Sequence, residues 1–217
     1  MSVQRLPPLA LQPGKRVAIV GGGRSRLRCP LWLPGERWGI NYLHGAYDPE
    51  ENGQFSRWFN IHRRAHLERD HALPDGALRF ARHLPQEVPY YVGDPEPWWD
   101  VPASRPFPAD ELMRAGGPFH WLPPIQRAYH CSSFDWCVAL ALSEGFGALD
   151  VYGFDMRDAE EPPAARACME WWLGLAAGLG ATITVAEPTD LFWAVHTVHT
   201  RQPYGVTDWK PLVVEGE

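Results

Sequence analysis

The sequence predicts a single α/β domain whose sheet is Rossmann-like, doubly wound and mostly parallel. A short β-branched run at residues 16–20 opens directly into Gly21-Gly22-Gly23, as buried parallel strands that lead into ligand loops do. A strand, helix and strand follow one another in residues 149–185, an order that calls for parallel strands and a right-handed crossover. The length of 217 residues suffices to bury a core without disulfides or a structural metal.

We expect the chain to be organised around this one domain. Its parts in order are a flexible leader at residues 1–14, the domain itself at 15–200 and a C-terminal tail at 201–217. Residues 94–117 are rich in proline and carry Trp98-Trp99. They predict a long loop insertion with at most one short helix at 109–114, and such loops often cover a site.

The first half of the domain is expected to supply four short strands. They are predicted at residues 16–20, 38–42, 57–61 and 88–92. Residues 63–83, between the third and fourth strands, are rich in Arg and His and have helical character. The second and third strands end in or near Asn41 and Asn60.

The second half of the domain is expected to alternate helix and strand. Ser132 and Ser133 can cap a helix, and Gly145 ends it. The predicted elements in order are a helix at 134–144, a strand at 149–153, a helix at 164–179 and a strand at 182–185.

Charge and cysteine usage exclude some classes of function. A net charge of −6 and an isoelectric point near 5.8 argue against a basic, nucleic-acid-binding surface. The four cysteines have no CxxC spacing and predict reduced thiols, which fits a cytoplasmic protein. The sequence has no apolar stretch long enough for a signal sequence or a membrane span, so we expect neither.

The loop Gly21-Gly22-Gly23-Arg24-Ser25 is the strongest candidate for a ligand site. Its glycines can bring backbone NH groups to a phosphate, Ser25 adds a hydroxyl donor and Arg24 adds charge. The spacing is neither a full GxGxxG nor GK[ST], so neither a nicotinamide site nor a P-loop ATP site is indicated. The alternative is a tight structural turn with exposed arginines.

Polar residues after three predicted strands extend this candidate site. Asn41, Asn60 and Asp155 each lie at or just past a strand's carboxyl end, the edge where open parallel sheets bind ligands. An amide there can bind a base, a ribose or a phosphate. Asp155 can hold a ribose hydroxyl, or a phosphate through Mg²⁺. The alternative is that these side chains cap loops or following helices.

Two pairs of histidines offer further chemistry. His62 and His66 have the i, i+4 spacing of a metal site, but no third ligand follows from the spacing, so we assign no metal. The alternative for that pair is a polar helix face. His196 and His199 could supply a general base, and the alternative for them is a plain surface position.

The 11 tryptophans exceed the usual share of a globular protein. They predict either an aromatic ligand cleft or packing in the core and at interfaces. The second interpretation leaves a homo-oligomer open.

These motifs resemble those of bacterial sialyltransferases of the Campylobacter type. Residues 17–25, Val-Ala-Ile-Val-Gly-Gly-Gly-Arg-Ser, are similar to that family's first strand and its Gly-x-Gly-x-Ser loop, which wraps the nucleotide phosphate. Residues 130–156 resemble its Ser-rich turn, Ala-rich helix, strand and Gly-x-Asp ending. Archaeal pterin diphosphokinase-like proteins share this layout, and small phage and prophage proteins add a Trp-Phe-Asn-x-His stretch like residues 58–62. The middle of the chain has no counterpart.

The resemblance implies a Rossmann-like fold and a cytidine-type nucleotide as ligand, with the helix after the serines facing a phosphate. The residues that would surround the nucleotide are Gly21, Gly23, Ser25, Asn41, Asn60, Ser132 and Ser133. The family's lid supplies a histidine base and tyrosines after the Gly-x-Asp strand, and residues 156–163 contain neither. The transfer chemistry is therefore not carried over, and His196, His199 or the middle loop would have to supply the base.

From these features we expect a nucleotide-dependent, glycosyltransferase-like transferase, in which the loop holds the leaving group and a histidine deprotonates the acceptor. Three alternatives stay open. They are a diphosphokinase-like enzyme that uses Asp155 with Mg²⁺, a non-catalytic phage protein that sequesters a nucleotide, and an interaction protein with a tryptophan-rich interface.

Overall fold

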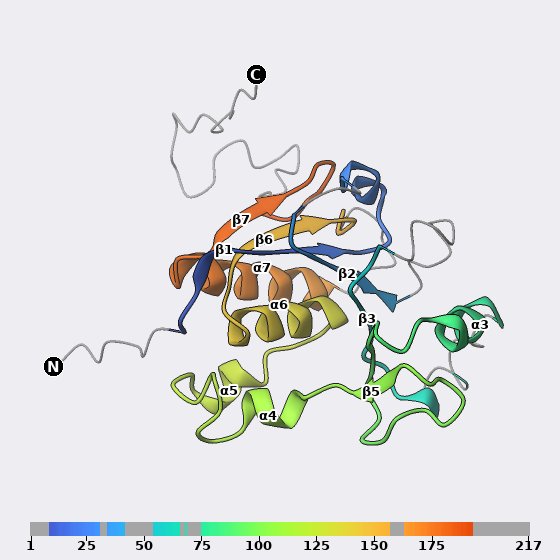
Figure 1. Ribbon diagram of the computed structural model, residues 1–217. Helices are drawn as coiled ribbons and strands as arrows, with labels where there is room; N and C mark the ends of the chain where they lie inside the picture. The colour runs from blue at the N-terminus through green and yellow to red at the C-terminus, as the bar shows by residue number, and fades with distance from the viewer. Residues whose placement is uncertain are drawn as a thin grey trace, which may run out of the picture.

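The computed structural model describes residues 9–30, 34–41, 54–65, 68, 75–156 and 163–192. Within this part of the chain, seven strands form one sheet in the order β5-β4-β3-β2-β1-β6-β7 (Figure 1). Every neighbouring pair of strands is parallel. The predicted α/β fold with a doubly wound sheet is confirmed, and the sheet is wholly parallel.

The strands follow the predicted runs closely, with one addition. They are β1 (Gln12–Val20), β2 (Glu36–Ile40), β3 (Arg57–Asn60), β4 (Tyr90–Val92), β5 (Ser104–Pro106), β6 (Phe146–Tyr152) and β7 (Thr182–Val185). The prediction that residues 94–117 contain at most a short helix was wrong, because β5 lies among them. The run Ser-Arg-Pro has little strand propensity, and its proline is tolerated because β5 is an edge strand.

One 3-10 turn and five α-helices have their bounds within the described residues, and residues 64, 65 and 68 are helical as well. The bounded elements are η1 (Arg24–Arg28), α3 (Asp75–His83), α4 (Ala109–Met113), α5 (Pro124–Arg127), α6 (Ser133–Ser143) and α7 (Pro163–Gly178). The predicted helix at 134–144 begins one residue earlier, so Ser132 alone is its N-cap and Ser133 is its first residue. The turn η1 and the short helix α5 were not predicted.

Alternating side chains of β1 divide the core between the two faces of the sheet. Val17 and Ile19 pack with α6 and α7, whereas Ala18 and Val20 belong to a second cluster with Trp58 and other residues of the opposite face. Helices α6 and α7 lie side by side along one face, and α3 lies apart from them near β3 (Figure 1). The central strands β1 and β6 are thus covered on both faces of the sheet, which explains why consecutive residues along them are buried.

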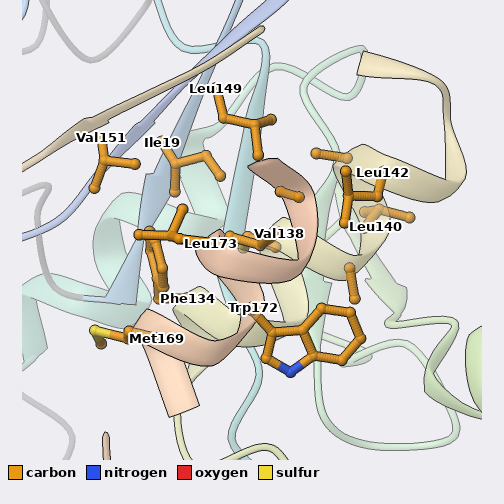
Figure 2. Close-up of a cluster of buried hydrophobic side chains, with 14 of the residues drawn as sticks. Ile19, Phe134, Val138, Leu140, Leu142, Leu149, Val151, Met169, Trp172 and Leu173 are labelled. Atoms are coloured by element: carbon orange, nitrogen blue, oxygen red, sulfur yellow. The ribbon is translucent and has the colours of Figure 1, made fainter. Parts of the chain in front are cut away.

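The larger core is centred on Trp172 of α7, which is fully buried. Figure 2 shows Trp172 and Leu173 of α7 beside Val138 of α6, with Ile19 and Leu149 of the sheet above them. The indole Nε1 of Trp172 donates to the carbonyl of Tyr129 at 2.9 Å, so its polar group is paired inside the core. Helices α6 and α7 have few polar residues because they pack in this core.

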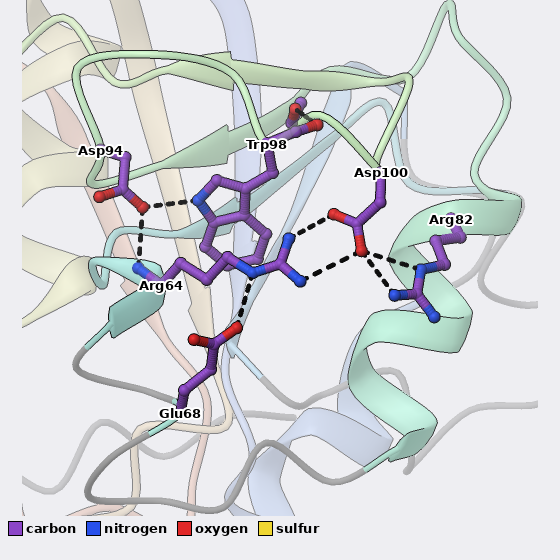
Figure 3. Close-up of polar contacts among 7 residues, drawn as sticks. Arg64, Glu68, Arg82, Asp94, Trp98 and Asp100 are labelled. Atoms are coloured by element: carbon purple, nitrogen blue, oxygen red, sulfur yellow. Dashed lines mark hydrogen bonds and ion pairs between the residues drawn. The ribbon is translucent and has the colours of Figure 1, made fainter.

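The start of the predicted insertion is held to the domain by a network of charged residues (Figure 3). Arg64 and Arg82 both pair with the carboxylate of Asp100, whose side chain is 7% exposed. Asp94 accepts from the backbone N of Arg64 at 2.8 Å and from Nε1 of Trp98 at 2.6 Å. The insertion is therefore fixed close to the segment that follows β3.

The substitution Asp100→Asn is expected to destabilise the protein by about 1–2 kcal/mol at neutral pH, because it removes the carboxylate that Arg64 and Arg82 share and leaves Arg64 paired with Glu68 alone among the described residues. The two guanidinium groups, Arg64 first, lower the pKa of Asp100 to about 2. Its contribution is therefore complete above about pH 4, where the unfolded carboxylate is also ionised, and is lost as the pH falls toward about 2.

Urea unfolding of wild type and Asp100→Asn between pH 7 and pH 2 measures this difference. Glu96→Gln is the matched control, since it removes an exposed carboxylate from the same loop. A stability gap that stays constant from pH 7 down to pH 2 would rule out this role for Asp100.

Candidate functional site

The order of the strands places the candidate site at the carboxyl ends of β1 and β6. The chain runs outward from β1 to β5, then returns to β6 on the other side of β1. In open parallel sheets, this reversal opens the crevice in which ligands bind. The loop after β1 and the residues after β6, which include Asp155, meet there.

Asp155 closes the glycine loop from the inside. Its carboxylate accepts from the backbone N of Arg24 at 2.5 Å, the backbone N of Ser25 at 3.2 Å and the hydroxyl of Ser25 at 2.5 Å. The same hydroxyl accepts from the backbone N of Gly153 at 2.8 Å. A Cβ on Gly23 would lie 2.6 Å from the Asp155 carboxyl carbon, so any larger residue there would displace this carboxylate. The carboxylate thus occupies donors that the sequence analysis offered to a phosphate.

The backbone of the loop is also satisfied by β6. The N–H of Gly21 donates to the carbonyl of Tyr152, and that of Gly23 donates to the carbonyl of Gly153. Gly22 differs, because a Cβ built on it meets no atom within 4 Å. Arg24 is exposed, whereas Arg26 turns back to the carbonyl of Gly22 at 2.6 Å. A ligand at this loop would therefore meet Gly22 and Arg24.

Asn41 and Ser133 meet at the same edge, although they lie 92 residues apart. The hydroxyl of Ser133 donates to Oδ1 of Asn41 at 3.2 Å. Asn41 has φ of 52°, a left-handed conformation that asparagine tolerates better than most residues, and its carbonyl accepts from Nε1 of Trp58 at 3.0 Å. The structure therefore brings together two residues that the sequence predicted separately.

Asn60, the last residue of β3, is fully buried with half of its amide unpaired. Its Nδ2 donates to the hydroxyl of Tyr90 at 3.0 Å, whereas its Oδ1 has no partner among the described residues. A buried acceptor without a donor costs about 1–3 kcal/mol. Such groups in native structures call for an explanation, and the binding of a ligand that carries a donor is one.

The N-terminus of α6 is closed by a capping box that includes a buried acid. The side chain of Ser132 accepts from the backbone N of Asp135, and Asp135 Oδ2 accepts from the backbone N of Cys131 at 2.8 Å and of Ser132 at 2.9 Å. Burial raises the pKa of Asp135 to about 6, against the lowering effect of these bonds. The Ser-x-x-Asp spacing would have revealed this cap, although not the burial of its acid.

His130, which was not predicted as a site residue, is half-buried, and both of its ring nitrogens are shielded from solvent. Its ring stacks between Trp136, at a centroid distance of 3.7 Å, and Trp172, at 4.6 Å. Burial lowers its pKa to about 3, and a contact with the carbonyl of Arg127 opposes this only in part. Neither ring nitrogen makes a well-formed hydrogen bond within the described part of the chain. The imidazole is therefore neutral at physiological pH.

Several predicted residues cannot be placed at this site. His66, His196 and His199 lie outside the described residues, and His62 lies just past the end of β3. In the ranges that the structure describes, no three His, Cys, Asp or Glu residues are grouped as metal ligands. No helix in those ranges is long and apolar enough to cross a bilayer. The four cysteines are free thiols.

Solved structures with a similar fold include complexes of a bacterial sialyltransferase. No family model and no curated protein matches the sequence. The sialyltransferase CstII from Campylobacter jejuni in complex with the substrate analogue CMP-3FNeuAc is 13% identical, with 79% of this chain and 80% of that chain covered and a TM-score of 0.50. A structure of CstII with cytidine-5'-monophosphate is 14% identical over 80% of each chain, with a TM-score of 0.45. At 13% identity, the likeness to the CMP-3FNeuAc complex shows a shared fold and no more.

Proposed function

We propose that this chain binds a cytidine-type nucleotide at the carboxyl edge of its sheet and acts as a nucleotide-sugar-dependent, glycosyltransferase-like enzyme. The contact between Asn41 and Ser133 carries the proposal. Asn41 follows β2, which pairs with β1 ahead of the glycine loop, so three separate segments present polar groups along one carboxyl edge of the sheet. The unpaired Oδ1 of Asn60 at the end of the adjacent strand supports it.

The proposed site binds the nucleotide in two parts. The amides of Asn41 and Asn60 and the hydroxyl of Ser133 would bind the base and ribose, since amides offer both donors and acceptors to such groups. The exposed guanidinium of Arg24, the open backbone at Gly22 and the N-terminus of α6 would attract the phosphate. Asp155, which holds the loop closed, then acts by positioning it.

The transfer step needs a base that the site residues above do not supply. In glycosyl transfer the acceptor hydroxyl attacks the anomeric carbon, the bond from that carbon to the phosphate oxygen breaks, and a base takes the hydroxyl proton. We propose His196 or His199 for this role. His130 is a poor base, because its pKa of about 3 leaves it little affinity for a proton.

A diphosphokinase-like reaction has less support. It would need Asp155 to hold Mg²⁺ between phosphates, whereas both oxygens of that carboxylate already accept from the loop. Binding without turnover, as in a sequestering protein, is the other outcome that the experiment below distinguishes. A phage origin and a cytoplasmic location stay predictions from the sequence.

Asn41→Gly is expected to weaken cytidine nucleotide binding by about 5- to 100-fold, because a polar group of the nucleotide left without its partner costs about 1–3 kcal/mol. Glycine suits the φ of 52° at this position, so the variant removes the amide without straining the backbone. Thermal shift with CMP, CDP, UMP, AMP and GMP, with and without Mg²⁺, measures the change.

Ser133→Ala and Ser143→Ala make a matched pair, since they remove one hydroxyl from the first and last residues of α6. Only Ser133→Ala is expected to weaken binding. A wild-type protein that no nucleotide stabilises would refute the proposed function. Binding of CMP with no release of CMP from CMP-sialic acid would favour sequestration over transfer.

A further inference from the structure

A pocket of about 520 Å³ is lined by residues of α5, of α7 and of the segment just before α5, and none of them takes part in the proposed nucleotide site. Its lining combines two indole rings, a carboxylate, an amide and a bare stretch of helix. The residues that matter here are Trp121, Gln126, Glu170, Trp171 and Gly174. The pocket has the size and the mixture of apolar and polar groups of a small-ligand site.

The two indole rings of the pocket are held in place by the fold. Nε1 of Trp121 donates to the carbonyl of Pro118 at 3.0 Å. Trp171 makes edge-on contacts with Trp172, at a centroid distance of 5.0 Å, and with Tyr129, at 5.9 Å. Both rings are half-buried and line the pocket. A ligand that packs on them would meet a preformed apolar surface and would pay little ordering entropy.

The polar groups of the pocket are of the kind that bind hydroxyls. Oε1 of Glu170 accepts from Nε of Arg166 at 2.8 Å and from the backbone N of Phe192 at 2.7 Å, so the carboxylate has a fixed orientation. Gln126 of α5 is exposed and offers an amide with both donors and acceptors. Polar groups thus border the apolar rings.

Gly174 leaves the helix backbone bare at the pocket. It lies within α7, where glycine is among the least favourable residues. A Cβ built on Gly174 meets no atom within 4 Å, so the packing of the protein does not require glycine there. Close approach of a ligand to the helix backbone would account for it.

We propose that this pocket binds a neutral pyranose ring of a saccharide. A pyranose has apolar C–H faces, which suit Trp121 and Trp171, and a rim of hydroxyls, which suit Gln126 and Glu170. The Glu170 carboxylate and the net charge of −6 oppose an acidic sugar. The proposal does not depend on nucleotide binding, because the two sites share no residue.

The test is saturation-transfer NMR on the full chain without nucleotide, with lactose and methyl β-D-glucopyranoside as probes and glucuronic acid as the charged comparison. The wild type is expected to transfer saturation to the ring C–H protons of the neutral sugars and less to glucuronic acid. Gly174→Leu fills the floor of the pocket and is expected to weaken binding about tenfold. Leucine is a better helix former than glycine, so the variant is expected to stay folded.

Gly178→Leu is the matched control. This variant makes the same change one turn further along α7. A Cβ built on Gly178 also meets no atom within 4 Å, and Gly178 does not line the pocket. This variant is expected to bind the sugars as the wild type does.

Absence of saturation transfer in the wild type, or equal binding by Gly174→Leu, would overturn the proposal. Light scattering gives a further decisive outcome: a wild-type dimer that Gly174→Leu converts to a monomer would make a second copy of the chain the occupant. A thermal shift with CMP on the same samples tests the nucleotide site separately, so that either proposal can fail alone.

Discussion

Trp172→Ala is expected to lower the free energy of unfolding by about 3–5 kcal/mol, the range for removing a large buried aromatic side chain. Trp172 is a fully buried residue of α7, and Phe119 and His130 pack against its ring. Its loss leaves a cavity and leaves the Tyr129 carbonyl without its donor. Because total stability is commonly about 5–15 kcal/mol, the variant would be close to unfolding at physiological temperature.

Urea unfolding followed by far-ultraviolet circular dichroism measures this loss without depending on tryptophan fluorescence. Trp171→Ala is the control, since it removes the neighbouring, half-exposed indole. It is expected to cost markedly less. Equal losses in the two variants would mean that the core is not centred on Trp172.

Gly153→Ala is expected to cost about 3 kcal/mol or more and to abolish nucleotide binding with it. A Cβ at this position would lie 2.2 Å from the carbonyl oxygen of Gly21, and the residue has φ of 73°. Backbone lies on both sides of this contact, so no side-chain rotation can relieve it. The ends of β1 and β6 would have to separate, and the glycine loop would lose the carboxylate that closes it.

Thermal unfolding of Gly153→Ala beside Gly22→Ala tests this expectation. Gly22 belongs to the same loop, but a Cβ there meets no atom within 4 Å and its φ is not in the left-handed region. Gly22→Ala is expected to change stability by less than about 0.5 kcal/mol. A Gly153→Ala protein as stable as the wild type would show that the two strand ends do not approach this closely.

The sequence was most informative where strands are buried on both faces. The β-branched run before Gly21 and the helix between Ser132 and Gly145 have strong local signals, and the structure has them within a few residues of the prediction. β5 was missed because its three residues lack such a signal and become a strand only by pairing with β4. Tertiary context decides elements of this length.

The sequence predicted several residues of the candidate site, but not the hydrogen bonds and stacking contacts between them. Asn41, Asn60 and Asp155 were expected at one edge of the sheet because each lies at or just past the carboxyl end of a predicted strand, whereas Ser133 was added by the resemblance to sialyltransferases. The bond between Ser25 and Asp155 joins residues 130 positions apart, and nothing local to either residue announces it. The stacked, half-buried His130 was missed for the same reason, since its two stacking partners come from different helices.

Because β1 pairs with both β2 and β6, the centre of the sheet can be completed only late in synthesis of the chain. β2 is synthesised soon after β1, whereas Arg24 must wait for Asp155, 131 residues later, before its loop closes. Until β6 is made, β1 of the nascent chain is an apolar strand with one unpaired edge. Such edges are bound by chaperones and are prone to aggregate. A truncated product that ends before β6 would therefore be expected to aggregate rather than to persist as a smaller domain.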